Sequence, residues 1–510
     1  MRKKVLVMFY GFLVYGDNLH ECHKFCKLFI KYPMVKGLDF KGIDGFIDRP
    51  IYLFEYENGD SATIEIGLLP CGRYDDWENE RHPYIGYEDP DVILCRMRAT
   101  EKIGEVILGL EFNDAIGAGN NAWQRFPRIS QASEKRIPFV YVVPTCDAEI
   151  KDGDFRSLRH PNTIIQIAQV IMMFERKMPS LTFYIADAWH NAGLNSGYVS
   201  PALKEPDGEK DLVELTTNLI LSNIFEKDPL DKTQSYSIFD VLQRSLRKMC
   251  EQISFFLETD FTVLKNEMSI KNPEILTNEL ISYIFDNKIP TNTIFDLLGT
   301  AIQKACIPFK KNISTDSKYK REINPIMSIR NGDSKNLESL NFLNWTKDCS
   351  YKVELETDIA KKCKLIPISY KQGANEIAII NNKMYFSRLL RKTYRSIEDP
   401  VILHIERSER PAVFLPIAGY VKDTGGPAFS RPDKGLVGLA RALFGSDGYF
   451  GARIVLLYSD LIPKNWKDML ITAIRENNNG SSSMTNNLWR EIAKFATCVI
   501  SDKWENGMVL

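Results

Sequence analysis

Two acidic residues, Asp91 and Glu111, have the spacing that lets one β-hairpin bring their side chains together. Asp91 follows Pro90 at the start of the apolar run VILC, and Glu111 lies at the end of a second run, VILGLE. A turn near Gly104 predicts antiparallel pairing of the two runs, with the start of one strand beside the end of the other. Two carboxylates beside a backbone carbonyl, that of Phe112, form a set of oxygen ligands that suits Mg²⁺.

The chemistry expected of such a pair is phosphate chemistry. A divalent cation held by two carboxylates lowers the pKa of a bound water and neutralises negative charge on a phosphate. Asp91 or Glu111 taken alone is more often a surface carboxylate, because charged side chains are mostly exposed. The prediction therefore depends on both acids occurring in this order within one hairpin.

The elements around the hairpin alternate between strand and helix patterns, which predicts an α/β fold with a mixed sheet flanked by helices. The predicted strands are Val5–Leu13, Ile51–Glu55, Ala62–Ile66, Asp91–Arg98, Glu105–Phe112, Phe139–Val143 and Leu181–Ile185. The predicted helices are Asn18–Ile30, Asn121–Ser133 and Asn162–Arg176. We interpret the first run as a buried strand rather than a signal peptide, because no small-residue cleavage site follows it.

This order of elements and acids resembles the PD-(D/E)xK nucleases, the restriction-endonuclease-like superfamily. The resemblance rests on Pro90-Asp91 and on Leu110-Glu111-Phe112-Asn113, and it extends over roughly residues 15–190. It implies a Mg²⁺-dependent endonuclease that hydrolyses phosphodiester bonds in double-stranded DNA, in the manner of a type II restriction enzyme. It further implies that Asp91, Glu111 and the Phe112 carbonyl hold the metal. Cleavage of both strands needs two active sites, so a homodimer is expected.

One position departs from the family pattern. The motif lysine would fall at Asn113, and an asparagine side chain carries no charge. Another cation can take over its role, with Arg125, Lys102 and Lys135 as candidates, or Asn113 can orient the attacking water by hydrogen bonding. A third interpretation is that the site is inactive and the chain is a non-catalytic nucleic-acid-binding or regulatory protein on a nuclease-like scaffold. We expect Gln124 and Arg125, on the first turns of the following helix, to face the phosphate.

A chain of 510 residues is too long for a single ordinary core, so several domains are expected. We predict a nuclease-like catalytic domain over residues 1–200 and a helical linker or dimerisation region over 201–305. The second of these has apolar residues at i, i+3 and i+4, which is typical of packed helices. We predict a second α/β domain over 306–510, which could recognise DNA.

The C-terminal segment contains a short echo of the first hairpin. Glu398-Asp399-Pro400 repeats the order Glu88-Asp89-Pro90, and apolar residues follow both. Two interpretations stay open: chance similarity, or a second nuclease-like fold that has lost its acid, with Ile417 near the place of Glu111. The predicted elements are strands Val401–Ile405, Ala412–Ile417 and Ile454–Tyr458 and helices Leu436–Phe444, Trp466–Arg475 and Leu488–Ala496.

The net charge of −1 excludes a protein that binds nucleic acid through its overall charge. Local basic stretches remain, and we expect them to contact DNA phosphates; an ordinary solvated face is the alternative. These residues are Lys310, Lys311, Lys318, Lys320, Arg321, Arg388, Arg391, Lys392, Arg431 and Lys434.

The ten cysteines have no repeating spacing, which is typical of reduced thiols and favours a cytoplasmic protein. The cluster HECHKFC would spread its His and Cys side chains too widely around a helix to bind one zinc ion. We therefore expect its cysteines to pack in a core. No apolar run has the length that a membrane-spanning helix needs, so no membrane partner is expected.

Overall fold

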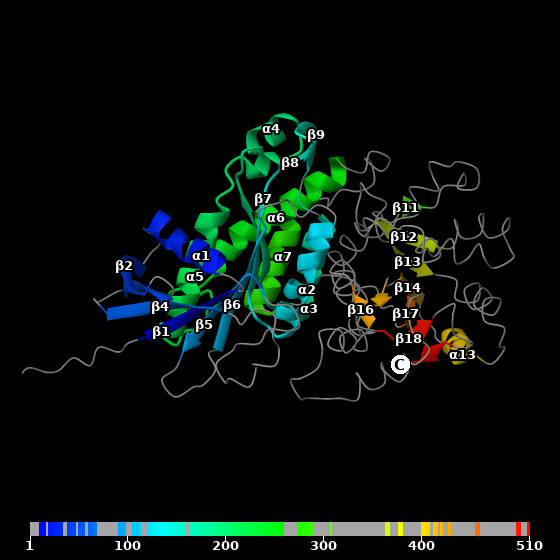
Figure 1. The fold of residues 1–510 in the computed structure, drawn as a ribbon. Helices are drawn as coiled ribbons and strands as arrows, with labels where there is room; N and C mark the ends of the chain where they lie inside the picture. The colour runs from blue at the N-terminus through cyan, green and yellow to red at the C-terminus, as the bar shows by residue number, and fades with distance from the viewer. Residues whose placement is uncertain are drawn as a thin grey trace, which may run out of the picture.

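In the computed structural model, two large β-sheets organise the chain (Figure 1). The structure describes residues 10–288 except 17–18, 34–37, 47–48, 57–59, 69–89, 98–104, 114–119, 160, 162 and 260–272. It further describes residues 307–308, 363–367, 376–380, 399–407, 412–416, 419–421, 427–429, 454–458, 496–500 and 507–509.

The first sheet has eight strands in the order β10-β7-β6-β5-β1-β4-β3-β2. The strands β5 and β6 form an antiparallel hairpin, β6, β7 and β10 run parallel, and β1 is antiparallel to β5. The strands are β1 (Tyr10–Gly16), β2 (Leu38–Phe46), β3 (Arg49–Tyr56), β4 (Asp60–Leu68), β5 (Val92–Met97), β6 (Glu105–Phe112), β7 (Phe139–Pro144) and β10 (Ser180–Ile185).

Helices cover both faces of this sheet. They are α1 (Leu19–Lys31), α2 (Asn120–Glu134) and α3 (Thr163–Arg176). On β6, Glu111 contacts α2, whereas the Phe112 ring lies under Lys24 of α1, with Nζ 4.5 Å from the ring centroid. Successive strand residues point to opposite faces, so α1 and α2 lie on opposite sides of the sheet, as Figure 1 shows.

Of the next three long helices along the chain, two pack on the same sheet and the third packs on helices of that layer. The helix α5 (Gly208–Ile224) contacts β10, β7 and α1, and α6 (Phe239–Thr259) contacts β10, α3 and α5. The helix α7 (Pro273–Asp286) packs against α6 and α3. Buried leucine, isoleucine and valine side chains of these helices belong to the same apolar core as β6, β7 and β10.

The second sheet has seven strands in the order β11-β12-β13-β14-β17-β18-β19. Its first three strand pairs are antiparallel, β14, β17 and β18 run parallel, and β19 returns antiparallel. The strands are β11 (Ile307–Pro308), β12 (Cys363–Pro367), β13 (Glu376–Ile380), β14 (Ala412–Pro416), β17 (Ile454–Tyr458), β18 (Cys498–Ile500) and β19 (Met508–Val509).

Most predicted elements of the N-terminal half are confirmed. The predicted helices match α1, α2 and α3, and the predicted hairpins match β3–β4 and β5–β6. The first described strand is β1 (Tyr10–Gly16), which overlaps the predicted Val5–Leu13 and ends three residues later; residues 5–9 lie outside the described part. The strand β2 and the hairpin β8–β9 (Asp147–Lys151 and Asp154–Arg159) were not predicted.

One prediction in the C-terminal half is wrong. Residues Val401–Ile405 are not a strand but lie in helix α13 (Pro400–Arg407). Asp399 caps this helix, because its Oδ1 accepts from the amides of Val401 and Ile402 at 2.8 and 3.2 Å. The predicted strands at 412 and 454 match β14 and β17, whereas the three helices predicted between 436 and 496 lie outside the described residues, apart from Ala496.

No helix within the described ranges is long and apolar enough to cross a membrane.

Candidate functional site

The β5–β6 hairpin places Asp91 directly beside Glu111. Val92 pairs with Leu110 in the antiparallel register, so the residue before Val92 lies opposite the residue after Leu110. The Asp91 amide donates to Glu111 Oε2 at 3.2 Å, and the Phe112 amide donates to Asp91 Oδ2 at 2.9 Å. Both acids are enclosed, with 3% of Asp91 and 0% of Glu111 exposed.

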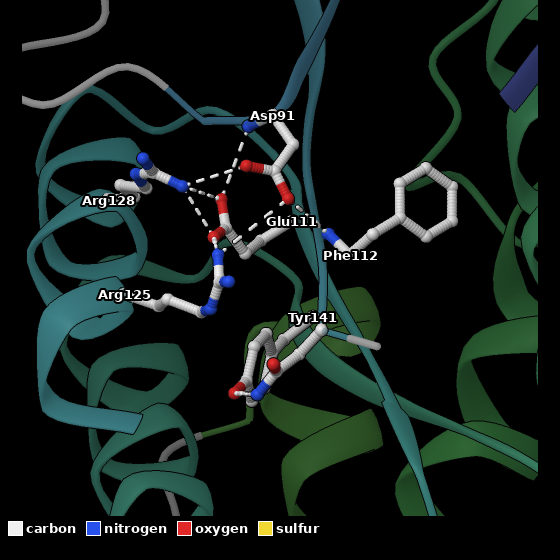
Figure 2. Close-up of polar contacts among 7 residues, drawn as sticks. Asp91, Glu111, Phe112, Arg125, Arg128 and Tyr141 are labelled. Carbon is white, nitrogen blue, oxygen red and sulfur yellow. Dashed lines mark hydrogen bonds and ion pairs between the residues drawn. The ribbon is translucent and has the colours of Figure 1, made fainter. Parts of the chain in front are cut away.

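Two arginines of α2 neutralise the acid pair. Arg128 Nη1 donates to Asp91 Oδ1 at 2.9 Å and also to both carboxylate oxygens of Glu111. Arg125 Nη1 donates to Glu111 Oε1 and lies 3.9 Å from Asp91 Oδ2. Figure 2 shows both side chains reaching from the helix to the two carboxylates, so the cluster holds two negative and two positive charges.

Burial and neighbouring charge act in opposite directions on Arg125. Burial lowers the pKa of its guanidinium, but the negative charges of Glu111 and Asp91 outweigh that effect, and the pKa is raised overall. Arg125 therefore stays charged throughout the range of pH in which proteins fold. Its side chain is 31% exposed and that of Arg128 is 17% exposed, so the cluster faces solvent through the arginines rather than through the acids.

Asn113 takes part in a neighbouring contact. Its Nδ2 donates to the hydroxyl of Tyr141 at 2.7 Å, and its backbone amide donates to the Val142 carbonyl at 2.9 Å. Asn113 is 2% exposed, and burial raises the pKa of Tyr141, whereas the bond from Asn113 opposes that rise. The neutral amide thus binds a neutral phenol beside the acid pair and supplies no positive charge.

The oxygen atoms at this end of the β5–β6 hairpin are of the kind that binds Mg²⁺. The amide and carbonyl of one strand residue point to the same side, so the Phe112 carbonyl faces the edge at which its amide meets Asp91. Carboxylate oxygens and a carbonyl are the hard ligands that Mg²⁺ prefers, and it typically uses one or two carboxylates together with waters and phosphate. Among the described residues, no cluster of three or more His, Cys, Asp or Glu side chains that could hold a metal ion is found.

The other sequence-predicted site residues are only partly placed. Gln124 lies on α2, with its side chain outside the described part, and Lys102 lies wholly outside it. Lys135 is exposed just beyond the end of α2, about 10 Å along the helix axis from Arg128 at ~1.5 Å per residue. It is therefore a poor substitute for the motif lysine. All ten basic residues predicted to contact DNA lie outside the described residues.

Arg128 is the site residue that the sequence interpretation missed. It follows Arg125 by three positions on a predicted helix, and residues spaced i and i+3 share one helix face. That spacing was the available signal, because a helix face that brings Arg125 to the acids brings Arg128 there too.

Comparison of the chain with models of protein families, with curated proteins and with solved structures found no match.

Proposed function

We propose that this protein is a Mg²⁺-dependent DNA endonuclease, similar to type II restriction enzymes, whose active site is the Asp91–Glu111 pair. The observation that carries the proposal is the convergence of two buried carboxylates at one sheet edge, beside two arginines. The order α1, β5–β6, α2, β7 is also the order of elements expected from the resemblance to PD-(D/E)xK nucleases. Two chains would be needed to cut both strands of a duplex, so the proposed active form is a homodimer.

The residues of the site have distinct proposed roles. Asp91, Glu111 and the Phe112 carbonyl would hold Mg²⁺, and the bound ion would supply an activated water and neutralise charge at the phosphate. Arg125 and Arg128 offer paired N–H donors, whose geometry matches phosphate oxygens as well as carboxylates. Asn113, through its amide, fixes the position of Tyr141 on the same face of the sheet. Gln124 is proposed to contact the phosphate from the first turns of α2.

The test is digestion of a mixed panel of DNA with the full chain in Mg²⁺, followed by sequencing of the fragment ends. We expect fragments in Mg²⁺, none in the presence of a chelator, and none from Glu111→Gln. The variant keeps the size of the side chain and removes the charge of the metal ligand. Fragments of equal yield from parent and variant would show that the cleavage does not use this site.

A second candidate function is a non-catalytic nucleic-acid-binding or regulatory protein on the same scaffold. The specific observation that favours it is Arg128, whose guanidinium binds both carboxylates, together with an uncharged Asn113 in place of the motif lysine. Shift of a labelled duplex without cleavage, in either Mg²⁺ or Mn²⁺, would support this candidate against the endonuclease.

A further inference from the structure

The acid pair and the arginine pair carry equal and opposite charge. Asp91 and Glu111 contribute two negative charges, and Arg125 and Arg128 contribute two positive charges at contact distance. A divalent cation on the same carboxylates would leave the cluster with an excess of two positive charges. A buried excess of charge is costly unless a counter-ion accompanies it, and the phosphodiester of DNA is such an anion.

We propose that Arg125 and Arg128 are exchangeable counter-ions, which occupy the carboxylates in the free protein and hold the DNA phosphate once a divalent cation binds. This inference rests on the proposed function and states how that same site is loaded. It also assigns to the two arginines the positive charge that Asn113 does not provide.

The geometry supports such an exchange. The two arginines lie three positions apart on one face of α2, so they can move together without a change in the helix. Arg125 is the more exposed of the two, so it is placed to meet an incoming phosphate first. A guanidinium donates to phosphate oxygens with the same forked geometry as to carboxylate oxygens, so its N–H groups keep partners throughout the exchange.

Two consequences follow for binding. The free protein binds a divalent cation weakly, because the cation must displace two charge-assisted contacts from the carboxylates. Cation and DNA then bind with positive coupling, since each favours the state in which the arginines have left the acids. Removal of one arginine therefore has opposite effects on two measurements: it strengthens cation binding without DNA and weakens cleavage.

The experiment is a Mn²⁺ titration of the full chain at pH 8 without DNA, followed by the electron paramagnetic resonance signal of free Mn²⁺. We expect Arg128→Gln to bind Mn²⁺ about tenfold tighter than the parent or more, as loss of a charge-assisted contact predicts. We expect Arg128→Lys to remain close to the parent. The matched control is Arg244→Gln on α6, an arginine paired with Asp211 and Glu214 away from the site, and its affinity should equal that of the parent.

The outcomes separate this inference from the proposed function. If Arg128→Gln does not fold, as judged by circular dichroism, the more exposed Arg125→Gln provides the same test, with tighter Mn²⁺ binding expected. Unchanged Mn²⁺ affinity in both glutamine variants, with cleavage that still requires Glu111, overturns the counter-ion role and leaves the endonuclease intact. Absence of any Glu111-dependent Mn²⁺ binding or cleavage in all variants overturns the proposed function itself.

Discussion

Each sheet contains five neighbouring strands that follow one another in chain order. They are β1, β5, β6, β7 and β10 in the first sheet and β12, β13, β14, β17 and β18 in the second. In both sets the second strand is antiparallel to its neighbours and the last three strands are parallel. The two halves of the chain therefore share a five-strand plan. They differ in the residues at one end of the sheet, where the start of the second strand of that plan lies beside the end of the third.

That end carries two acids in the first sheet and one in the second. Asp91 precedes β5 and Glu111 lies near the end of β6. In the second sheet, β13 begins with Glu376. Ala378 pairs with Phe414 of β14, so the same register places Glu376 opposite Pro416 at the end of β14. The strand plan brings two strand ends together, but only an acid on each strand makes a pair that can hold a metal.

The two buried aspartates beside prolines show the same contrast. Asp91 faces Glu111 and Arg128, whereas Asp399 accepts backbone amides, including that of Gly507 at 2.7 Å. The charge of Asp399 is thus satisfied by the start of α13 and by the segment near the C-terminus. A buried acid next to a proline is therefore a structural cap in one half and a candidate ligand in the other.

The largest effect that distinguishes the halves is expected in cleavage. If the proposed function is correct, Asp91→Asn should lower the rate of Mg²⁺-dependent DNA cleavage by about 10³-fold or more, because it removes the charge of one proposed metal ligand, worth several kcal/mol in the transition state. Glu376→Gln, the matched change at the second sheet, should leave the rate within about twofold of the parent, a negligible change in barrier. Rates measured on the same duplex decide the matter, and equal losses in both variants would refute the difference between the sheets.

The next effect concerns stability. Arg128→Ala should lower the free energy of unfolding by roughly 3 kcal/mol, because it leaves two buried carboxylates with only Arg125 as counter-ion. Urea unfolding of Arg128→Ala, Glu111→Gln and the double variant measures the coupling between the two side chains. The double variant should be more stable than Arg128→Ala alone, and strict additivity would show that the ion pair has no energetic role.

A smaller effect is expected at the aspartate of the second half. Asp399→Ala should lower the opening free energy of the α13 amides by about 1–2 kcal/mol, because the helix loses its N-cap. Hydrogen exchange of residues 401–407 measures it, and DNA cleavage should be unchanged. A loss of cleavage comparable to that of Asp91→Asn would mean that the C-terminal half contributes directly to the reaction.

The smallest effect is expected beside the acid pair. Tyr141→Phe removes the acceptor of the Asn113 amide and should cost about 1 kcal/mol of stability, with cleavage reduced by less than about tenfold. Thermal unfolding and cleavage rates of the same preparation check both numbers. A cleavage loss as large as that of Asp91→Asn would place Tyr141 among the reacting groups.

The sequence predicts the first half well for identifiable reasons. The strands β5 and β6 are apolar runs on either side of a predicted turn, and antiparallel pairing of two such runs brings the acid before one beside the acid at the end of the other. Arg128 was not predicted because it lies one turn beyond Gln124 and Arg125, the two residues of this helix that were expected to face the phosphate. The packing of α5, α6 and α7 on β10 and α3 could not be predicted, since periodicity gives the buried face of a helix but not its partner.

The second half shows where local patterns conflict. Val401–Ile405 has four apolar residues and His404, a short pattern that suits a buried strand or a short helix equally. Asp399 followed by Pro400 is a helix-start signal, because the aspartate suits the N-cap and the proline suits the first helical position. The helix α13 does begin at Pro400. The echo at Asp399 suggested a related fold in the second half, but it aligned the helix α13 with the strand β5, so it did not give the correspondence between the strands of the two sheets.

The most direct test of the central claim is an anomalous difference map from crystals of the full chain grown with Mn²⁺ and a duplex identified by the digestion panel. The account predicts a peak about 2.1 Å from carboxylate oxygens of both Asp91 and Glu111, with Arg125 and Arg128 turned to a DNA phosphate. A map with no peak at the acid pair, and with both arginines still bound to the carboxylates, would contradict it.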